Sequence, residues 1–201
     1  MLELEILKTP EQELYELTDE LMALRARAAE IRRKIPAVPV ENYSFTGMSG
    51  EQTSLLDMFG SHNEMILIHN MGRSCRYCTL WADGFNGFTK HFENRAAFVV
   101  TTPDNYEIAR KFSMERGWMF RLFSTEGTSF KRDMGFASES GDVSPGFSIF
   151  KKEADGTIVH VTKDFFGPGD DYCSIWHFFD MLPSDTGWEP QYHYISTVHK
   201  H

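Results

Sequence analysis

Two cysteines separated by two residues, Cys75 and Cys78, are the side chains of this chain best suited to chemistry. They follow the apolar run 65–68 and open a predicted helix, which places the first sulfur at a helix N-terminus. Unpaired backbone N–H groups and the helix dipole favour a thiolate there. A thiolate is the nucleophile of disulfide exchange, and a cysteine one turn later can resolve the mixed disulfide. The pattern of strand, short loop, CxxC and helix therefore favours a redox-active pair.

Three other interpretations of the pair remain open. It could be half of a zinc site, but such sites usually have four ligands and no second CxxC exists. The remaining cysteine is Cys173, so a zinc site would have to include some of the eight histidines. It could anchor a c-type haem, but Thr79 stands where a histidine is required. It could also be a structural disulfide or two inert thiols. We interpret Cys173, in a predicted helix, as a buried inert thiol.

Composition limits the classes of function. The 201 residues suffice for one domain with an appendage, and the net charge of −9 argues against a nucleic-acid partner. No run of about 18 apolar residues occurs, so no membrane span is expected. The acidic start, residues 1–5, lacks a signal-peptide pattern, and an odd number of cysteines does not suit a secreted disulfide framework. We expect a reducing cytoplasm and no metal.

Residues 10–35 are predicted to form a helix. Thr9 can cap it, Pro10 suits its first position, and Pro36 stops it. One face carries apolar residues at alternating spacings of three and four, which form a heptad seam: Leu14, Leu17, Leu21, Leu24, Ala28, Ile31 and Ile35. Such a seam is too apolar to stand alone in water, so this arm, residues 1–39, is expected to pack on the body or on a second subunit, with a homodimer slightly favoured.

The body, residues 40–183, has the pattern of a mixed α/β domain, and the tail 184–201 has no clear period. Strands are predicted at 43–46, 65–69, 97–101 and 121–124, and a hairpin at 147–151 and 157–162 around Asp155-Gly156. Helices are predicted at 54–59, 75–93, 105–117 and 171–181. Trp81, Phe85 and Phe88 share one helical face and are expected in the core.

This order of elements resembles the thioredoxin fold, a three-layer α/β fold in which helices flank a mixed central sheet. Members of that superfamily carry a cis-proline that faces the CxxC just before the hairpin. Here Ser144-Pro145 stands in the matching place, and the resemblance implies a cis bond and a role in the substrate groove. An ordinary turn proline is the alternative.

A closer resemblance covers most of the chain, from the N-terminal helix to near Pro183. The stretch Cys75-x-x-Cys78-x-x-Trp81-Ala82-Asp83-Gly84-Phe85-Asn86-Gly87 looks like the signature of the family labelled domain of unknown function 899. That family is thioredoxin-like and has no established activity.

Departures from thioredoxin affect the site. Ser74 replaces the usual tryptophan before the first cysteine, and Arg76-Tyr77 replaces Gly-Pro. Arg73 and Arg76 are expected to favour the thiolate. His69 lies six residues before Cys75, where thioredoxins place a proton-relaying carboxylate, and could do that work nearer neutral pH. A satisfied strand histidine is the alternative. The peroxiredoxin sequence pattern is absent.

The favoured function is a thiol–disulfide oxidoreductase that needs no cofactor beyond its redox-active disulfide. In this hypothesis Cys75 attacks, Cys78 resolves and His69 shuttles protons. Pro145 shapes the substrate groove; its remaining lining and thiolate-stabilising residues are Arg73, Ser74, Arg76, Tyr77 and Ser144. The partner would be a thiol or disulfide protein or a small thiol. The alternatives are a non-catalytic or redox-sensing dimeric protein and, less favoured, a thiol peroxidase that uses Cys75.

Overall fold

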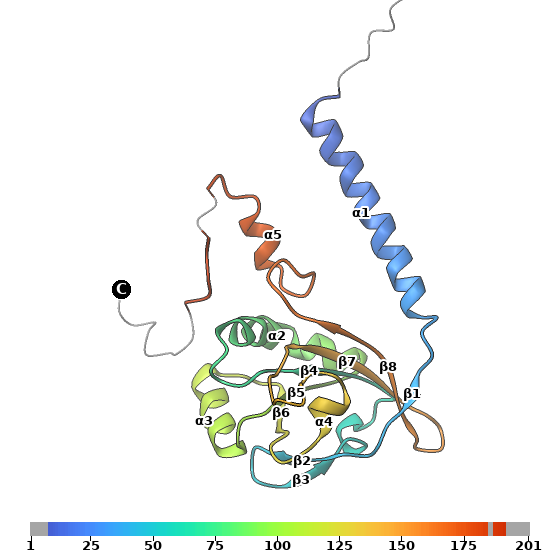
Figure 1. Ribbon diagram of the computed structural model, residues 1–201, viewed down its shortest axis with the longest axis vertical. Coiled ribbons are helices and arrows are strands. Elements are labelled where there is room, and N and C mark those ends of the chain that lie inside the picture. Colours follow the sequence, from blue (N-terminus) through green and yellow to red (C-terminus); the bar gives the residue numbers. More distant parts are fainter. Residues whose placement is uncertain (1–7, 185–186, 192–201) are drawn as a thin grey trace, which may run out of the picture. The chain divides into compact units, whose positions relative to one another are not determined.

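The computed structural model describes residues 8–184 and 187–191 of the 201-residue chain (Figure 1). The chain divides into two compact units, Met1–Pro36 and Ala37–His201. In the described part of the chain, no helix has the length and apolar character needed to cross a membrane.

In its described part, residues 8–36, the first unit contains one helix, α1, Pro10–Arg32. Its start is fixed by a capping box, in which the Thr9 hydroxyl accepts the Gln12 N–H and the Gln12 side chain accepts the Thr9 N–H. The helix stops short of the predicted end at residue 35 because the chain tightens into i→i−3 hydrogen bonds before Pro36, which disfavours helical geometry at the preceding residue. No residue of α1 is buried, and the seam residue Leu14 is 65% exposed.

The second unit is built on one mixed sheet of eight strands within the described residues. Along the chain the strands are β1 Val38–Pro39, β2 Ser44–Gly47, β3 Gln52–Ser54, β4 Glu64–His69, β5 Ala97–Thr102, β6 Arg121–Ser124, β7 Gly146–Lys152 and β8 Ile158–Phe165. Their order in the sheet is β1-β8-β7-β4-β5-β6-β2-β3. Strands β4, β5 and β6 are parallel, and the other pairings are antiparallel. The predicted mixed α/β architecture is confirmed.

The helices of this unit are α2 Arg76–Arg95, α3 Tyr106–Arg116, α4 Phe130–Asp133 and α5 Ile175–Phe179, with a 3-10 turn, η1, at Asp57–Phe59. Helix α5 is shorter than the predicted 171–181 because the Asp170 carboxylate accepts the N–H groups of Tyr172 and Cys173 and holds that segment in a turn. The short elements β1, β3 and α4 were not predicted.

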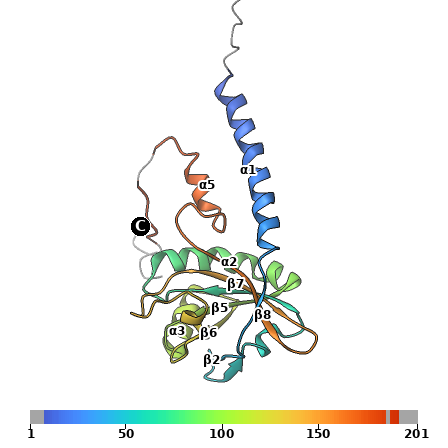
Figure 2. The ribbon, with the colours of Figure 1, turned by 45° about the vertical axis from the view of Figure 1, so that its right-hand side comes forward.

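Helices cover both faces of the sheet: Figure 1 shows α2 and α4 on its two sides, and Figure 2 shows α2 above the strands from a second direction. Side chains alternate between two cores along β4: Met65 and Leu67 join one core, and Ile66 and Ile68 join the other. The first core contains residues of η1 and α4, and the second contains residues of α2, α3 and α5. The domain therefore has three layers, with the site-bearing helix α2 and the short helix α4 on opposite faces of the sheet.

One aromatic residue predicted in the core is outside it. Helix α2 buries Trp81, Phe85 and Thr89, at steps of four residues, whereas Phe88 is 57% exposed. At 3.6 residues per turn, the buried positions 78, 82, 85 and 89 centre the inward face of the helix roughly 90° around its axis from position 88, which therefore lies at the solvent edge of that face. There the Phe88 ring packs edge-on against Phe92.

The start of β7 lies against the end of β4, where Gly146 pairs with His69 on one side and with Phe165 on the other. A Cβ atom at Gly146 would lie 2.3 Å from the Asp164 carbonyl oxygen and 2.5 Å from a ring carbon of Phe136. The strand can approach its neighbours this closely only with glycine.

We therefore expect Gly146→Ala to lower the free energy of unfolding by about 1–3 kcal/mol, the usual cost of overpacking. Gly84→Ala is the matched control, because Gly84 lies on an exposed part of α2 with nothing near its Cβ position. It should raise stability by roughly 0.5–1 kcal/mol through helix propensity. Urea unfolding measures both, and equal effects would contradict the close packing at Gly146.

Candidate active site

Cys75 is the N-cap residue of α2. Its backbone is extended (φ −88°, ψ 108°), its carbonyl accepts the N–H of Thr79, and its sulfur accepts the N–H of Cys78 at 3.1 Å. The sulfur thus occupies the place that a serine or aspartate oxygen usually takes at a helix start. An anion at this position faces unpaired N–H groups and the positive end of the helix dipole.

The two cysteines have opposite electrostatic environments. A hydrogen bond from the Cys78 side chain lowers the pKa of Cys75 to about 7, assisted by the backbone N–H groups of Cys78 and Tyr77 and opposed by partial burial. The same hydrogen bond, together with burial, raises the pKa of Cys78. Cys78 is only 3% exposed, whereas Cys75 is half-buried. The arrangement favours a thiolate on the accessible sulfur and a thiol on the buried one.

The connection from β4 to α2 places further polar groups around Cys78. The Met71 N–H donates to the Cys78 sulfur at 3.4 Å, and the Asn70 side-chain amide donates to the Cys78 carbonyl at 3.4 Å. The backbone carbonyl of Asn70 accepts a hydrogen bond from the Lys131 ammonium at 2.8 Å. Lys131 is buried in α4, and its burial lowers its pKa to about 7.

The predicted proton shuttle, His69, is fully buried on the α4 side of the sheet. Its ring stacks on Phe136 with centroids 3.8 Å apart, and its Nε2 atom is bonded to the Ser148 hydroxyl at 3.0 Å. Burial and the Lys131 charge lower the pKa of His69 well below its usual value, so the ring is neutral at physiological pH. This environment does not give the near-neutral pKa that the sequence interpretation assumed.

Besides Cys75, the ionisable side chain that interacts electrostatically with Cys78 is Lys131. Sequence reasoning missed it because a single lysine in the polar stretch 129–133 has no distinguishing pattern. The sequence feature that could have indicated its position is the preceding Phe130, which is buried in the core and anchors this short helix there.

Pro145 does lie close to the buried cysteine, and both line a cavity of about 10 Å³. The prediction of a cis Ser144–Pro145 bond is wrong, because none of the described peptide bonds is cis. The Ser144 N–H donates to the Phe136 carbonyl and the Pro145 carbonyl accepts the Phe166 N–H. These bonds hold a trans, extended chain that leads directly into β7.

The remaining predicted site residues surround Cys75 on the surface. The Arg76 guanidinium lies 3.3 Å from the Glu189 carboxylate, and the Tyr77 ring packs beside Trp81 and Trp176. Ser74 is exposed, and the backbone of Arg73 donates to Asp104. The lowered pKa of Cys75 therefore results from hydrogen bonds with Cys78, rather than from the two arginines to which the sequence interpretation attributed it.

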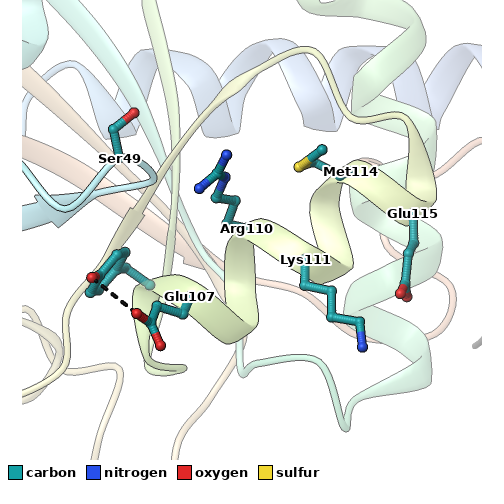
Figure 3. Close-up of a pocket in the computed structure, with 7 residues that line it drawn as sticks. Ser49, Glu107, Arg110, Lys111, Met114 and Glu115 are labelled. Atoms are coloured by element: carbon teal, nitrogen blue, oxygen red, sulfur yellow. Dashed lines mark hydrogen bonds between the residues drawn. The ribbon is translucent and has the colours of Figure 1, made fainter.

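A larger hollow of about 550 Å³ lies along α3, away from the cysteines (Figure 3). Its charged lining mixes Arg110 and Lys111 with Glu107 and Glu115, and it contains no cysteine. Among residues 8–184 and 187–191, no cluster of three or more histidine, cysteine or acidic side chains has the arrangement of a metal site. The thiol pair remains the centre with the clearest chemistry.

Comparison with known proteins supports this picture of the fold. The family described as "Bacterial protein of unknown function (DUF899)" matches residues 5–200. No curated protein sequence matches the chain.

Several solved structures with a similar fold are peroxiredoxins. A peroxiredoxin Q mutant from Xylella fastidiosa has a TM-score of 0.55 at 12% identity, over 72% of this chain and 94% of its own. The Xanthomonas campestris bacterioferritin comigratory protein, described as having alkyl peroxide reduction activity, has a TM-score of 0.52 at 17% identity, over 72% of this chain and 98% of its own. Peroxidoxin BcpB from Mycobacterium tuberculosis has a TM-score of 0.50 at 21% identity, over 61% and 80%. The predicted thioredoxin-like fold is thereby confirmed.

The hydrogen bond between the two cysteines gives a direct test. In a Cys173→Ser background, Cys78→Ala removes the side-chain donor and should raise the pKa of Cys75 from about 7 towards that of a free thiol, about 8.5. Cys78→Ser retains a donor and should keep the pKa low. The rate of Cys75 alkylation by iodoacetamide as a function of pH measures both, and equal midpoints in the two variants would contradict this role of Cys78.

Proposed function

Because this chain belongs to the DUF899 family and has a thioredoxin-like fold, we propose that it is a thiol–disulfide oxidoreductase acting through Cys75 and Cys78. One observation carries the proposal: a half-buried thiol with a lowered pKa caps α2, directly beside a buried thiol with a raised pKa. This asymmetry suits a nucleophile and a resolving residue.

In the proposed cycle, the Cys75 thiolate attacks a disulfide of the substrate and forms a mixed disulfide. Cys78 then attacks the Cys75 sulfur, which releases the second substrate thiol and leaves a Cys75–Cys78 disulfide. A thiol protein or a small thiol returns two electrons to the pair. The cycle uses no metal and no organic cofactor, and its electron donor suits a reducing compartment such as the cytoplasm.

A thiol peroxidase is the second candidate, supported by the peroxiredoxins among the similar folds and by the lowered pKa of Cys75. In that reaction the thiolate attacks a peroxide oxygen, the O–O bond breaks, and an alcohol or water leaves. The resulting sulfenic acid on Cys75 condenses with the Cys78 thiol to a disulfide and water. The similarity at these identities concerns the fold, so this candidate ranks below disulfide exchange.

Two assays on the same protein separate the candidates. We expect insulin reduction with dithiothreitol as the electron donor, its loss in Cys75→Ser, and a trapped mixed disulfide in Cys78→Ser. Cys173→Ser is the matched control and should keep full activity. Faster turnover of peroxide than of insulin would favour the peroxidase, and inactivity in both assays with a disulfide still forming would favour a redox sensor.

We also propose that α1 pairs with α1 of a second copy of this chain. The helix buries none of its own residues, and the seam residues Leu14, Leu17, Leu21 and Leu24 are each 47–65% exposed. A heptad seam of this kind is stabilised by a partner helix that covers it.

Light scattering should therefore give the mass of a dimer. Leu17→Glu with Leu24→Glu should give a monomer, because charges in the seam would lose their hydration in the interface. Glutamate is a good helix former, so the helix itself is retained. Glu16→Gln with Glu20→Gln, outside the seam, is the control and should remain dimeric. A monomeric unmutated protein would dispose of the proposal.

A further inference from the structure

One peptide group connects side chains from the two faces of the sheet at the candidate site. The Asn70 carbonyl accepts the Lys131 ammonium at 2.8 Å, and the Met71 N–H, which belongs to the same peptide, donates to the Cys78 sulfur at 3.4 Å. Lys131 comes from α4, and Cys78 comes from α2 on the opposite face of the sheet. The Asn70–Met71 peptide, just beyond the end of β4, thus lies between a buried cation and the buried sulfur.

The burial of Lys131 is unusual for a lysine. The residue is 5% exposed, and lysine is rarely buried unless it is paired. The ionisable groups that face it are Cys78 from α2, Asp104 after β5 and His69 from β4. Burial holds its pKa near 7, and Cys78 and Asp104 act in the opposite direction by favouring the ammonium.

Lys163 provides a comparison within the same chain. Its ammonium also donates to a backbone carbonyl, that of Met134, at 2.7 Å. The residue is exposed, however, and its carbonyl partner is remote in sequence from the peptide that contacts Cys78. A role as a carbonyl-binding side chain therefore does not require the deep burial seen for Lys131.

We propose that Lys131 is a positioning residue for the resolving cysteine: its ammonium polarises the Asn70–Met71 peptide and stabilises the Cys78 thiolate that attacks the mixed disulfide. A cation on the carbonyl strengthens the hydrogen bond donated by the N–H of the same peptide. The field of the ammonium also favours a nearby anion directly. The inference rests on the proposed disulfide exchange and assigns a residue to its second step.

The step balances as follows. Cys75 attacks the substrate disulfide and releases one substrate thiolate, which takes up the proton of the Cys78 thiol. The Cys78 thiolate then forms a bond with the Cys75 sulfur, and the bond between that sulfur and the substrate breaks, releasing the second substrate thiolate. The cysteine pair is oxidised by two electrons, and the substrate disulfide is reduced by two.

This sequence explains why the raised pKa of Cys78 does not block resolution. In the reduced pair, the hydrogen bond to Cys75 holds the proton on Cys78. Once the Cys75 sulfur is part of a mixed disulfide, its negative charge is gone and this restraint is lifted. Lys131 and the Met71 N–H remain in place and stabilise the new thiolate.

The test uses the full chain with Cys173→Ser and the aromatic disulfide dithiobis(nitrobenzoate). The first coloured thiolate released reports the attack by Cys75, and the second reports the attack by Cys78. We expect Lys131→Met to leave the first phase unchanged, to slow the second by about tenfold or more at neutral pH, and to shift its pH midpoint upward, since one pKa unit corresponds to a factor of ten.

Variants separate charge from structure. Lys131→Arg retains a cation and should restore much of the second phase, whereas Lys131→Gln, which keeps a donor without charge, should not. Lys163→Met is the matched control and should leave both phases unchanged. Circular dichroism checks that each variant is folded. A folded Lys131→Met or Lys131→Gln protein with an unaltered second phase would overturn the inference.

The Cys173→Ser protein also tests the inference without any change at Lys131. The pH midpoint of its second phase should lie below that of an ordinary thiol, about 8.5, despite the burial of Cys78; a midpoint above this value would contradict the role of Lys131. Absence of the first phase would instead contradict the proposed function, so the two failures are distinguishable.

Discussion

The hydrogen bonds that Cys78 gives to the sulfur of Cys75 are the interactions on which the candidate site depends. The backbone bond caps α2, so the helix and the nucleophile are set in place together. The side-chain bond lowers the pKa of one sulfur and raises that of the other. Two chemically identical side chains become different because one is at the helix start and the other is one turn inside it.

The central sheet fixes where this helix begins. Strand β4 lies between β5 and β7, and its last residue, His69, is paired on both sides, with Thr101 and with Gly146. The Asn70 N–H still bonds to the Thr101 carbonyl, so the chain leaves the sheet in a defined direction. Gly72 then takes a positive φ of 100°, which an L side chain rarely adopts, and brings the chain round to Cys75 within a few residues.

Local patterns in the sequence were sufficient to predict the main elements of this arrangement. The apolar runs of β4 and β5 and the capped helices α1 and α3 have signals that lie within a few residues of each element. The Cys75–Cys78 spacing is likewise local, and it located the thiol pair at the start of α2. Short elements such as β1 and α4 lack such signals, because two to four residues are too few to show a period.

Features set by tertiary contacts could not be predicted in the same way. Phe88 fits the apolar face of α2 by spacing alone, but in the folded domain Thr89 is buried and Phe88 is exposed. The extended chain around Pro145 is held by hydrogen bonds to Phe136 and Phe166, which a local pattern at residues 144–145 does not reveal. Lys131 approaches the site from the opposite face of the sheet, across a separation in sequence of 61 residues from Asn70.

The position of Lys131 also bears on why a fold would bury a cation beside a disulfide-forming pair. A buried charge lowers stability unless other groups compensate it, and an apolar side chain of similar length would fill the same space at a lower cost. In the reduced state, the hydrogen bond to Cys75 keeps Cys78 protonated, so the cation then has only partial compensation. It gains a full countercharge when Cys78 becomes a thiolate. The burial of the Lys131 charge is therefore least unfavourable in the intermediate that contains the Cys78 thiolate, from which the Cys75–Cys78 disulfide forms. A charge that stabilises such an intermediate more than the resting state promotes the reaction step rather than the stability of the resting fold.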